Sequence, residues 1–313
     1  MQYSEINNRR LSKLTLGTVA LGKDYGISNK SGKPALTDSR EILSSALNAG
    51  INFIDTANDY GNAEQIIGEY LEKYKNGKQV NVVTKFKISK ANLLNKERAR
   101  AEAFRSVRSS LQLLKTKRVA ICLFHKSMDQ PVEQVLEILP SLFSDLINDG
   151  LADTCGVSVF HPDELNTFLS HPVLQAFQSP MNLFDQRLIK NGALKKLNEE
   201  KKILFIRSVF LQGLFFMSPD ELTGNLAQAS EYIRTLQGIS TESGMSIAQL
   251  AFSYLRDLDG ISSLVFGAVA PEQVMQNAGL LNGPALSREL RLQIEKRFAD
   301  VPEEIITPAL WSL

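Results

Sequence analysis

The sequence predicts a (β/α)8 barrel of the α/β class, and three observations support this fold. Short apolar or β-branched runs alternate with longer segments of helical periodicity until eight strands have been counted. No linker rich in Pro, Gly or Ser divides the 313 residues, and such a barrel alone takes roughly 250 residues. The competing open, doubly wound sheet normally carries G-x-G-x-x-G after its first strand, whereas this chain has LGTVALG. We therefore expect one barrel domain over residues 1–313.

The first half of the chain supplies four of these strands and the helices that follow them. Residues 14–18 form the first expected strand, and a polar loop that contains glycines follows it. The next helix is expected to begin near Asp38, because Asp38 and Glu41 have the spacing of a capping box, and to end at Gly50. The further expected segments are strand 52–56, helix 62–74, strand 80–86, helix 96–114 and strand 118–124.

The second half repeats the pattern and ends in a tail. Apolar residues recur at helical spacing from Val132 to Leu146, which predicts a helix there. The other four strands are expected at 154–158, 173–178, 203–208 and 262–266, with helical stretches between them. After Ala285 the sequence predicts one more helix and an irregular tail that contains Trp311. The pattern leaves open whether this tail covers the barrel mouth or packs on the surface.

Composition excludes several functional classes. The formal net charge of +1 gives no long-range attraction to nucleic acid or to an anionic membrane. No apolar run reaches about 18 residues and the N-terminus lacks the apolar stretch of a signal peptide, so we expect a cytoplasmic protein without a membrane partner. Cys122 and Cys155 lie in apolar strand-like runs and are expected to be buried thiols. Since no CxxC motif or His/Cys cluster is present, no metal site is expected.

Four ionisable residues of different type stand at or just after the ends of the second, third and fourth expected strands: Asp55, Tyr60, Lys85 and His125. The active site of a (β/α)8 barrel lies at the carboxyl ends of its strands. Adjacent parallel strands are about 4.8 Å apart, so these side chains are expected to share one small volume.

This set suits the reduction of a carbonyl group. A hydride that arrives at a carbonyl carbon leaves negative charge on the oxygen, and Tyr60 can donate a proton to it. The ammonium of Lys85 is expected to lower the pKa of Tyr60, Asp55 to hold that lysine, and His125 to orient the substrate oxygen. Each residue alone also has a structural interpretation, as an ion pair, a buried histidine or a packed tyrosine. Their occurrence together at successive strand ends favours a catalytic role over a purely structural one.

The segments around these residues resemble the aldo-keto reductase family over nearly the whole chain. The most specific is INFIDTANDYGNAEQIIGEYL, which contains Asp55 and Tyr60, and VVTKF and SLQLLKTKRVAICLFHK supply Lys85 and His125. The resemblance implies a (β/α)8 barrel that binds NAD(P)(H) without a Rossmann domain. It also implies a small-molecule carbonyl substrate, with Tyr60 as general acid/base supported by Lys85 and Asp55.

Later segments, including GVSVF, SVFLQGLF and FGAVAPEQVMQN, resemble the family's cofactor-binding segments in the right order. Ser158 and Gln178 match residues that bind the nicotinamide carboxamide. Arg207 stands where many members stack an aromatic ring on the nicotinamide. The whole implied cofactor set is Gly17, Thr18, Ser158, Gln178, Arg207, Ser208, Leu211, Gly213, Gly267, Gln273 and Asn277.

Two departures from the family concern how the cofactor is held. Val159 replaces the usual asparagine after the serine, which removes one carboxamide contact. Members that select NADP usually carry Lys or Arg near Gly267, Val269 or Gln273, and this chain has none at those positions. The 2′-phosphate of NADP would therefore lack charge-assisted partners. Between the two cofactors, NADP and NAD, the sequence thus favours the use of NAD or a weak selectivity for NADP.

The opening segment LGTVALGKDYGISNKSGKP resembles a bacterial subgroup associated with surface-polysaccharide genes, which favours a sugar or sugar-derived carbonyl. Two alternatives remain open. One is a regulatory or binding barrel that holds the cofactor with little turnover. The other is a barrel isomerase or lyase without nicotinamide. The sequence does not predict an oligomeric state.

Overall fold

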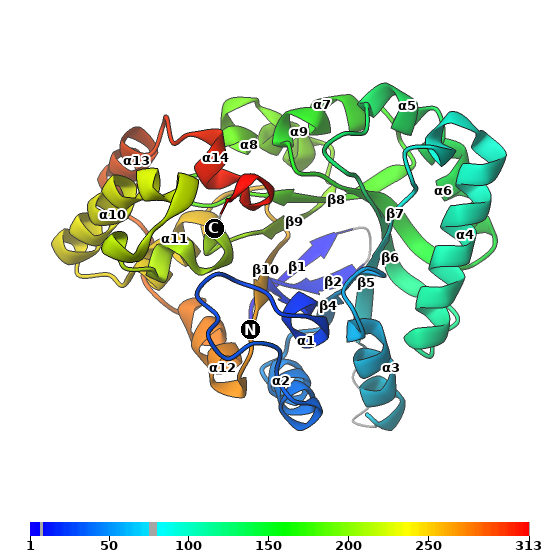
Figure 1. Ribbon diagram of the computed structural model, residues 1–313, viewed down its shortest axis with the longest axis horizontal. Coiled ribbons are helices and arrows are strands. Elements are labelled where there is room, and N and C mark those ends of the chain that lie inside the picture. Colours follow the sequence, from blue (N-terminus) through cyan, green and yellow to red (C-terminus); the bar gives the residue numbers. More distant parts are fainter. Residues whose placement is uncertain (7–8, 75–79, 313) are drawn as a thin grey trace.

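The computed structural model contains a closed barrel of eight parallel strands, in which the last strand pairs with the first (Figure 1). The structure describes residues 1–6, 9–74 and 80–312. Each strand overlaps a predicted one, so the predicted (β/α)8 fold is confirmed. The barrel strands are β3 (Leu14–Gly17), β4 (Phe53–Asp55), β5 (Asn81–Phe86), β6 (Val119–His125), β7 (Ala152–Ser158), β8 (Leu174–Pro180), β9 (Ile203–Arg207) and β10 (Ser263–Gly267).

Helices surround this barrel on the outside (Figure 1). They are α1 (Val19–Gly22), α2 (Leu36–Asn48), α3 (Ala63–Lys73), α4 (Lys96–Leu113), α5 (Val132–Leu136), α6 (Leu139–Asn148), α7 (Leu165–Phe168), α8 (Arg187–Lys190), α9 (Ala193–Glu199), α10 (Ala229–Ser243), α11 (Ile247–Arg256), α12 (Pro271–Leu280), α13 (Arg288–Arg297) and α14 (Glu303–Ile306).

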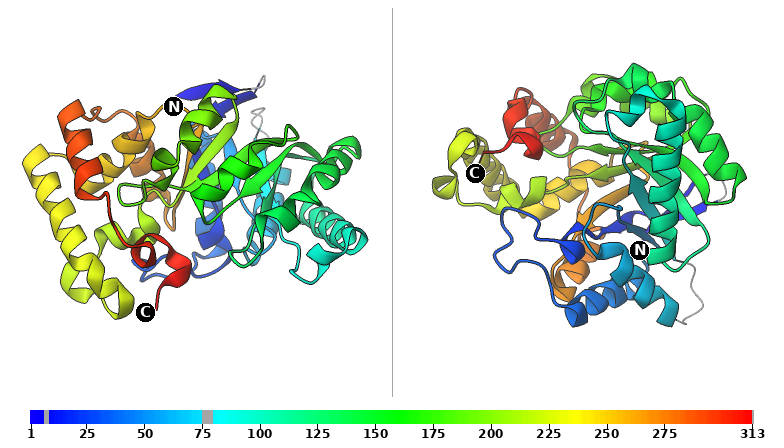
Figure 2. Two further views of the ribbon diagram at one scale, coloured as in Figure 1. Left: turned by 90° about the horizontal axis from the view of Figure 1, so that it is seen from above. Right: turned by 45° about the vertical axis from the view of Figure 1, so that its right-hand side comes forward.

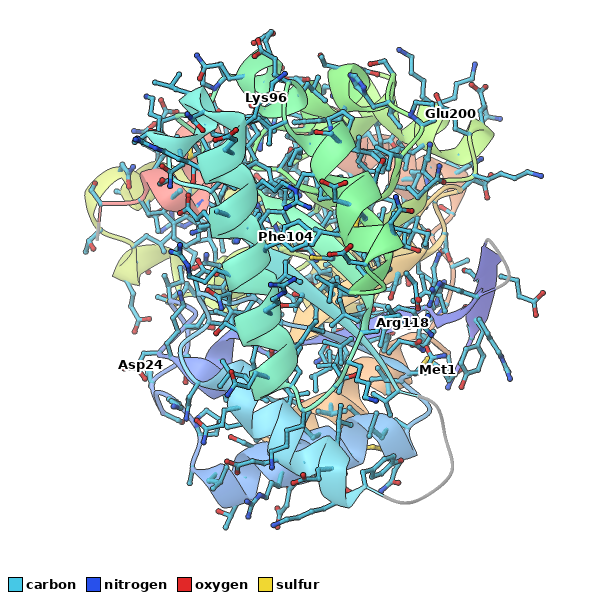
Figure 3. All side chains as sticks on the ribbon, turned by 90° about the vertical axis from the view of Figure 1, so that its right-hand side faces the viewer. Met1, Asp24, Lys96, Phe104, Arg118 and Glu200 are labelled. Atoms are coloured by element: carbon cyan, nitrogen blue, oxygen red, sulfur yellow. The ribbon has the colours of Figure 1, made fainter. Side chains whose placement is uncertain are left out.

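The strands separate two apolar cores. One fills the barrel interior with side chains such as Phe53, Val83 and Phe205. The other lies between the barrel and the helices, where the buried face of each helix packs. Figure 3 shows α4 along one side of the molecule, with Phe104 near its middle; Phe104 is buried, and the guanidinium of Arg100 covers its ring at 4.3 Å. Because α4 presents apolar residues at helical spacing on one side only, that side faces the strands.

An N-terminal hairpin that the sequence pattern did not predict closes one end of the barrel. Strands β1 (Tyr3–Ile6) and β2 (Arg9–Ser12) pair antiparallel. Leu11 is buried and belongs to the interior core, so the hairpin covers the amino ends of the barrel strands. In the left view of Figure 2 the hairpin and the C-terminal tail lie at opposite ends of the molecule. Met1 and Asp24 likewise lie on opposite sides in Figure 3.

Two local predictions were wrong. Helix α2 begins at Leu36, and its N-cap residue Ala35 makes no side-chain cap, so the predicted capping box at Asp38 and Glu41 does not exist. Asp38 instead lies in the first turn, where a negative charge interacts favourably with the helix dipole. The predicted helix from Val132 is two helices, because Pro140 has no amide hydrogen for a continuous helical ladder.

The predictions at Gly50 and at the two cysteines are confirmed. Gly50 follows α2 with a φ of +87°, a left-handed conformation that glycine adopts at helix ends. Cys122 and Cys155 are free and buried. Among the residues that the structure describes, no helix is long and apolar enough to cross a membrane.

The tail after α13 packs on the protein surface. The side-chain amide of Asn225 donates to the backbone oxygen of Leu310 at 2.8 Å. The backbone amide of Ser312 donates to the Asn225 Oδ1 at 3.0 Å. The indole of Trp311 donates to the backbone oxygen of Ile305 at 3.0 Å, within the tail itself. Asn225 lies between β9 and α10, beyond the carboxyl end of a strand, so the tail packs on the surface at the mouth end of the barrel.

Candidate active site

A cavity of about 740 Å³ opens at the carboxyl ends of the barrel strands. Its wall includes the last residues of β3, β4, β9 and β10 and the loops that follow them. It contains eleven of the predicted site residues: Gly17, Thr18, Asp55, Tyr60, Gln178, Arg207, Ser208, Gly213, Gly267, Gln273 and Asn277. The predicted residues outside this lining are Lys85, His125, Ser158 and Leu211.

Lys85 and Asp55 form a buried ion pair beneath the cavity. They come from adjacent strands, and the Lys85 Nζ lies 2.8 Å from the carboxylate. The same ammonium donates to the backbone oxygen of Thr56 at 2.8 Å, and the side chain of Gln178 donates to Asp55 at 2.7 Å. Burial lowers the pKa of Lys85, and the charge of Asp55 opposes that shift. The predicted role of Asp55 in holding Lys85 therefore has a direct geometric basis.

The hydroxyl of Tyr60 lies 3.5 Å from the Lys85 Nζ. The expectation that Lys85 lowers the pKa of Tyr60 was wrong for this structure. Burial and the negative charge of Asp55 together raise that pKa. Asp55 neutralises Lys85 at 2.8 Å, so little net positive charge from the pair reaches the phenol. Tyr60 is consequently a protonated hydroxyl at neutral pH.

The backbone around Tyr60 is fixed by close contact with α1. A Cβ atom added at Gly22 would lie 1.6 Å from the backbone oxygen of Tyr60. Gly61 has a φ of +57°, and a Cβ atom there would lie 2.2 Å from the backbone oxygen of Gly22. Only glycines permit this approach, so Gly22 and Gly61 together fix the backbone from which the Tyr60 side chain extends.

His125 ends β6 and faces Tyr60 edge-on, with ring centroids 6.5 Å apart. Its Nδ1 lies 3.7 Å from Asp59, too far for a hydrogen bond, and is buried without a partner. Burial lowers the pKa of His125, so the ring is neutral at neutral pH. Asp59 pairs with Lys87 at 2.7 Å. Sequence reasoning missed Asp59, although it directly precedes Tyr60.

Ser158 and Gln178 lie side by side at the ends of β7 and β8. The Ser158 hydroxyl donates to the Gln178 Oε1 at 3.4 Å, and the Gln178 amide group reaches Asp55. Both side chains are buried. Gln178 therefore links the position predicted for a carboxamide to the predicted catalytic ion pair.

Arg207, at the end of β9, is held by neutral groups. It donates to the backbone oxygen of Val159 at 3.0 Å and to the Ser208 hydroxyl at 3.3 Å. Its guanidinium lies 4.9 Å from the ring centroid of Phe160. Its Nε is buried and has no partner.

The loop after Arg207 is conformationally unusual. Ser208, Leu211 and Gln212 have φ values of +63°, +48° and +53°. Left-handed backbone costs free energy in residues with a Cβ atom and clusters at functional sites. The Leu211 side chain is completely buried in the core, so it anchors the loop and does not line the cavity.

At the opposite end of the cavity, α12 begins after Ala270. The amide of Val269 donates to the Gln273 side chain at 2.8 Å, and the Asn277 side chain donates to the backbone oxygen of Gln273 at 2.7 Å. Gly267 has open space beside its Cα. These contacts leave a neutral, hydrogen-bonding wall at the start of the helix.

The sequence of the whole barrel carries a family signature. A family model described as the aldo/keto reductase family matches residues 13–296. The chain belongs to the aldo/keto reductase family. It is accordingly an oxidoreductase of a family whose members use NAD(P)(H).

Named aldo-keto reductases are similar to this chain over most of their length. Aldo-keto reductase YhdN of Bacillus subtilis (strain 168) is 26% identical over 299 residues, which cover 88% of this chain and 87% of that protein. The NADH-specific methylglyoxal reductase of Escherichia coli (strain K12) is 26% identical over 299 residues, covering 87% and 90%. The solved holo form of an aldo-keto reductase from Bacillus halodurans has a TM-score of 0.75 at 20% identity, covering 97% and 99%, which supports the fold alone.

The cavity fits the cofactor of an aldo-keto reductase. Its volume lies in the range of roughly 300–1,000 Å³ that is typical of small-molecule and cofactor sites. The guanidinium of Arg207 supplies a positive charge at its wall, and the amide and hydroxyl groups of Gln178 and Ser208 supply hydrogen-bonding groups. The residues therefore suit a polar, dinucleotide-sized ligand.

Sequence reasoning missed the loop between β3 and α2, which supplies a second wall of this cavity. Tyr25, Ser28 and Lys30 line it, and the amide of Ile27 donates to the backbone oxygen of Gln212 at 3.1 Å. A Cβ atom at Gly213 would lie 1.9 Å from the Ser28 hydroxyl. The glycines and polar residues of this loop predicted only a turn, because its contact with Gln212 joins segments that are far apart in the sequence.

Proposed function

We propose that this aldo-keto reductase interconverts a carbonyl compound and its alcohol with NAD(P)(H), and that Tyr60 is its general acid/base. The observation that carries the proposal is the position of the Tyr60 hydroxyl. It lies 3.5 Å from the Lys85 Nζ and lines the same cavity as Asp55, Gln178 and Arg207.

The bound cofactor would supply or accept the hydride. Tyr60 is protonated at neutral pH because its pKa is raised, so it can donate a proton to the carbonyl oxygen in the reductive direction. His125 is neutral and close to Tyr60, where its ring can hydrogen-bond the substrate oxygen. Asp55 holds Lys85, and the Lys85 ammonium, which lies 3.5 Å from the Tyr60 hydroxyl, can donate a hydrogen bond to the phenolate that remains after proton transfer.

On the basis of the family resemblance, we propose that the cofactor lies along the cavity. Ser158 and Gln178 would bind the carboxamide, and Arg207 would lie against the nicotinamide. The backbone around Ser208, Leu211 and Gly213 would hold the pyrophosphate. The first-strand end at Gly17 and Thr18 and the wall formed by Gly267, Gln273 and Asn277 complete the proposed set.

We propose NAD(H) in preference to NADP(H). The wall at the start of α12 has no cation, and Lys30 and Arg207 are the basic residues in the described lining of the cavity. A relative with 26% identity is named as NADH-specific. Dissociation constants for NADH and NADPH, measured by nucleotide fluorescence, should favour NADH. Tighter binding of NADPH would show the preference to be wrong, and Lys30→Ala would then test whether Lys30 supplies the missing charge.

A small aldehyde, ketone or sugar-derived carbonyl is the proposed substrate class. One relative is named as a methylglyoxal reductase, and the opening segment favours a sugar-type carbonyl. The test is a reductase screen of simple and sugar aldehydes with both cofactors. Binding of the cofactor without turnover of any carbonyl would support the alternative of a regulatory barrel.

Tyr60→Phe tests the proposed general acid. It should lower kcat by about 10²-fold or more, because the proton donor is lost, while the dissociation constant for NADH stays within about twofold of wild type. Tyr232→Phe is the matched control, since Tyr232 lies on α10 outside the described cavity lining and should retain full kcat. Unchanged kcat in Tyr60→Phe would mean that another group is the acid.

A further inference from the structure

The basic residues around the candidate active site differ in what compensates their charge: Lys85 and Lys87 pair with carboxylates, Lys23 and Lys30 are exposed to solvent, and Arg207 is partly buried. Lys85 pairs with Asp55 at 2.8 Å, and Lys87 pairs with Asp59 at 2.7 Å. Arg207 also lines the cavity, but no carboxylate among the described residues lies within ion-pair distance of it. Guanidinium stays protonated at any physiological pH. Arg207 is therefore an uncompensated positive charge in the wall of the cavity.

This charge is fixed in place. One terminal nitrogen donates to the Val159 backbone oxygen, and the other donates to the Ser208 hydroxyl. The ring of Phe160 lies 4.9 Å from the guanidinium carbon and itself lies 6.0 Å from the ring of His125. These partners orient the guanidinium and none of them neutralises it. The charge also acts on the catalytic groups, since Arg207 favours ionisation of Tyr60 and opposes protonation of Lys85.

A fixed cation distinguishes the two redox states of a nicotinamide. The oxidised ring carries one positive charge, and the reduced ring is neutral. Two positive charges about 6 Å apart in a partly buried site repel each other enough to weaken binding by roughly 10- to 100-fold. The aromatic side chain that many family members carry at this position has no such effect.

We propose that Arg207 makes this cavity bind the reduced nicotinamide cofactor in preference to the oxidised form. The inference rests on the proposed function, because it requires a nicotinamide in this cavity. It adds a property that does not follow from reductase activity, namely discrimination between cofactor redox states by a residue of the wall.

The preference has a direct consequence for turnover in the reductive direction. A bound reduced nicotinamide would supply a hydride to the carbonyl carbon, and the carbonyl oxygen would take the Tyr60 proton, which leaves Tyr60 as the phenolate. The oxidised cofactor would carry a positive charge that Arg207 repels, so its release would be favoured. The enzyme would also bind the reduced cofactor when the oxidised form is in excess in solution. The equilibrium constant of the overall reaction would be unchanged.

The test measures dissociation constants for NADH and NAD⁺ by fluorescence titration and competition, in wild type, Arg207→Gln and Arg207→Lys. Wild type should bind NADH at least tenfold more tightly than NAD⁺. Arg207→Gln, which removes the charge and retains a hydrogen-bonding amide, should reduce that ratio by about tenfold, chiefly through tighter NAD⁺ binding. Arg207→Lys keeps the charge and should keep most of the ratio.

Adenosine diphosphate ribose, which lacks the nicotinamide, is the control ligand and should bind all three proteins alike. Equal affinity of wild type for NADH and NAD⁺ would overturn the inference without any variant. A ratio in Arg207→Gln within twofold of wild type, or equal weakening of both cofactors, would also overturn it, because Arg207 would then act only in packing. Failure of wild type to bind either nicotinamide at millimolar concentration would instead overturn the proposed function. NADPH and NADP⁺ would be compared in the same way.

Discussion

At the residue scale, the roles of the ionisable groups depend on what neutralises each of them. Lys85 was expected to acidify Tyr60, but Asp55 lies 2.8 Å from its ammonium and cancels most of that charge. The pKa of Tyr60 is therefore raised by burial and by Asp55. The sequence predicted which four residues come together, because strand ends converge in a barrel. It did not predict their pKa values, because these depend on distances of a few ångströms.

Glu64 gives a prediction about pH and stability. Its side chain is buried on α3 and accepts a hydrogen bond from Thr84, the neighbour of Lys85. Burial raises the pKa of Glu64 above its ordinary value. The folded state therefore binds a proton that the unfolded chain has released, once the pH exceeds the unfolded pKa of about 4.3. Stability from this group is present below that pH and is lost as pH rises through the folded pKa.

Glu64→Gln removes this titration and can retain the contact with Thr84. The variant's free energy of unfolding, relative to wild type, should rise from pH 4 upward, by at most about 1.4 kcal/mol per pH unit. Urea unfolding at pH 4, 5, 6 and 7 measures it. The same change at Glu69, which is partly exposed on the same helix, should leave the pH dependence close to wild type. A difference in unfolding free energy between Glu64→Gln and wild type that stays constant from pH 4 to pH 7 would mean that folding does not change the protonation of the Glu64 carboxyl.

At the scale of elements, periodicity predicted the segments better than their ends. All eight barrel strands were expected because each is a short apolar run between helical stretches. The hairpin of β1 and β2 was missed, since its strands, YSEI and RRLS, are mostly polar and contain no apolar run. The break between α5 and α6 was missed because the apolar spacing continues across it while Pro140 interrupts the hydrogen bonds.

The contact between α1 and the Tyr60 loop yields a prediction at this scale. Gly22→Ala would place a Cβ atom 1.6 Å from the Tyr60 backbone oxygen, so α1 or the loop must move. A displacement of about 1 Å at a reacting group costs on the order of 10²-fold in rate. We expect kcat to fall by that order in a variant that is still folded by circular dichroism.

Gly238→Ala is the matched control for Gly22→Ala. Gly238 lies inside α10, and an added Cβ atom there has no neighbour within 4 Å. This variant should keep wild-type kcat and gain roughly 0.5–1 kcal/mol of stability, since alanine is the better helix former. If Gly22→Ala also kept full kcat, the close approach of α1 would not be what positions Tyr60.

At the scale of the whole molecule, the barrel assigns its two ends to different tasks. The carboxyl ends of the strands carry the cavity, and the amino ends are covered by the hairpin. The sequence predicted that the site lies at the carboxyl ends of the strands, because a parallel barrel brings distant strand ends together. It did not predict the wall formed by Tyr25, Ser28 and Lys30, because that wall depends on contacts between two loops about 185 residues apart, such as Ile27 with Gln212.

This separation predicts that damage to the hairpin end changes stability without changing cofactor binding. Leu11 is 2% exposed in the interior core, so Leu11→Ala should cost about 2–5 kcal/mol of unfolding free energy. Leu94→Ala is the control: Leu94 is 75% exposed, and its loss should change stability by no more than about 0.5 kcal/mol. Urea unfolding measures both, and NADH titration should give dissociation constants within about twofold of wild type in each. A loss of NADH affinity in parallel with the loss of stability in Leu11→Ala would show that packing at the amino end controls the geometry of the cavity, and that the two ends of the barrel are energetically coupled.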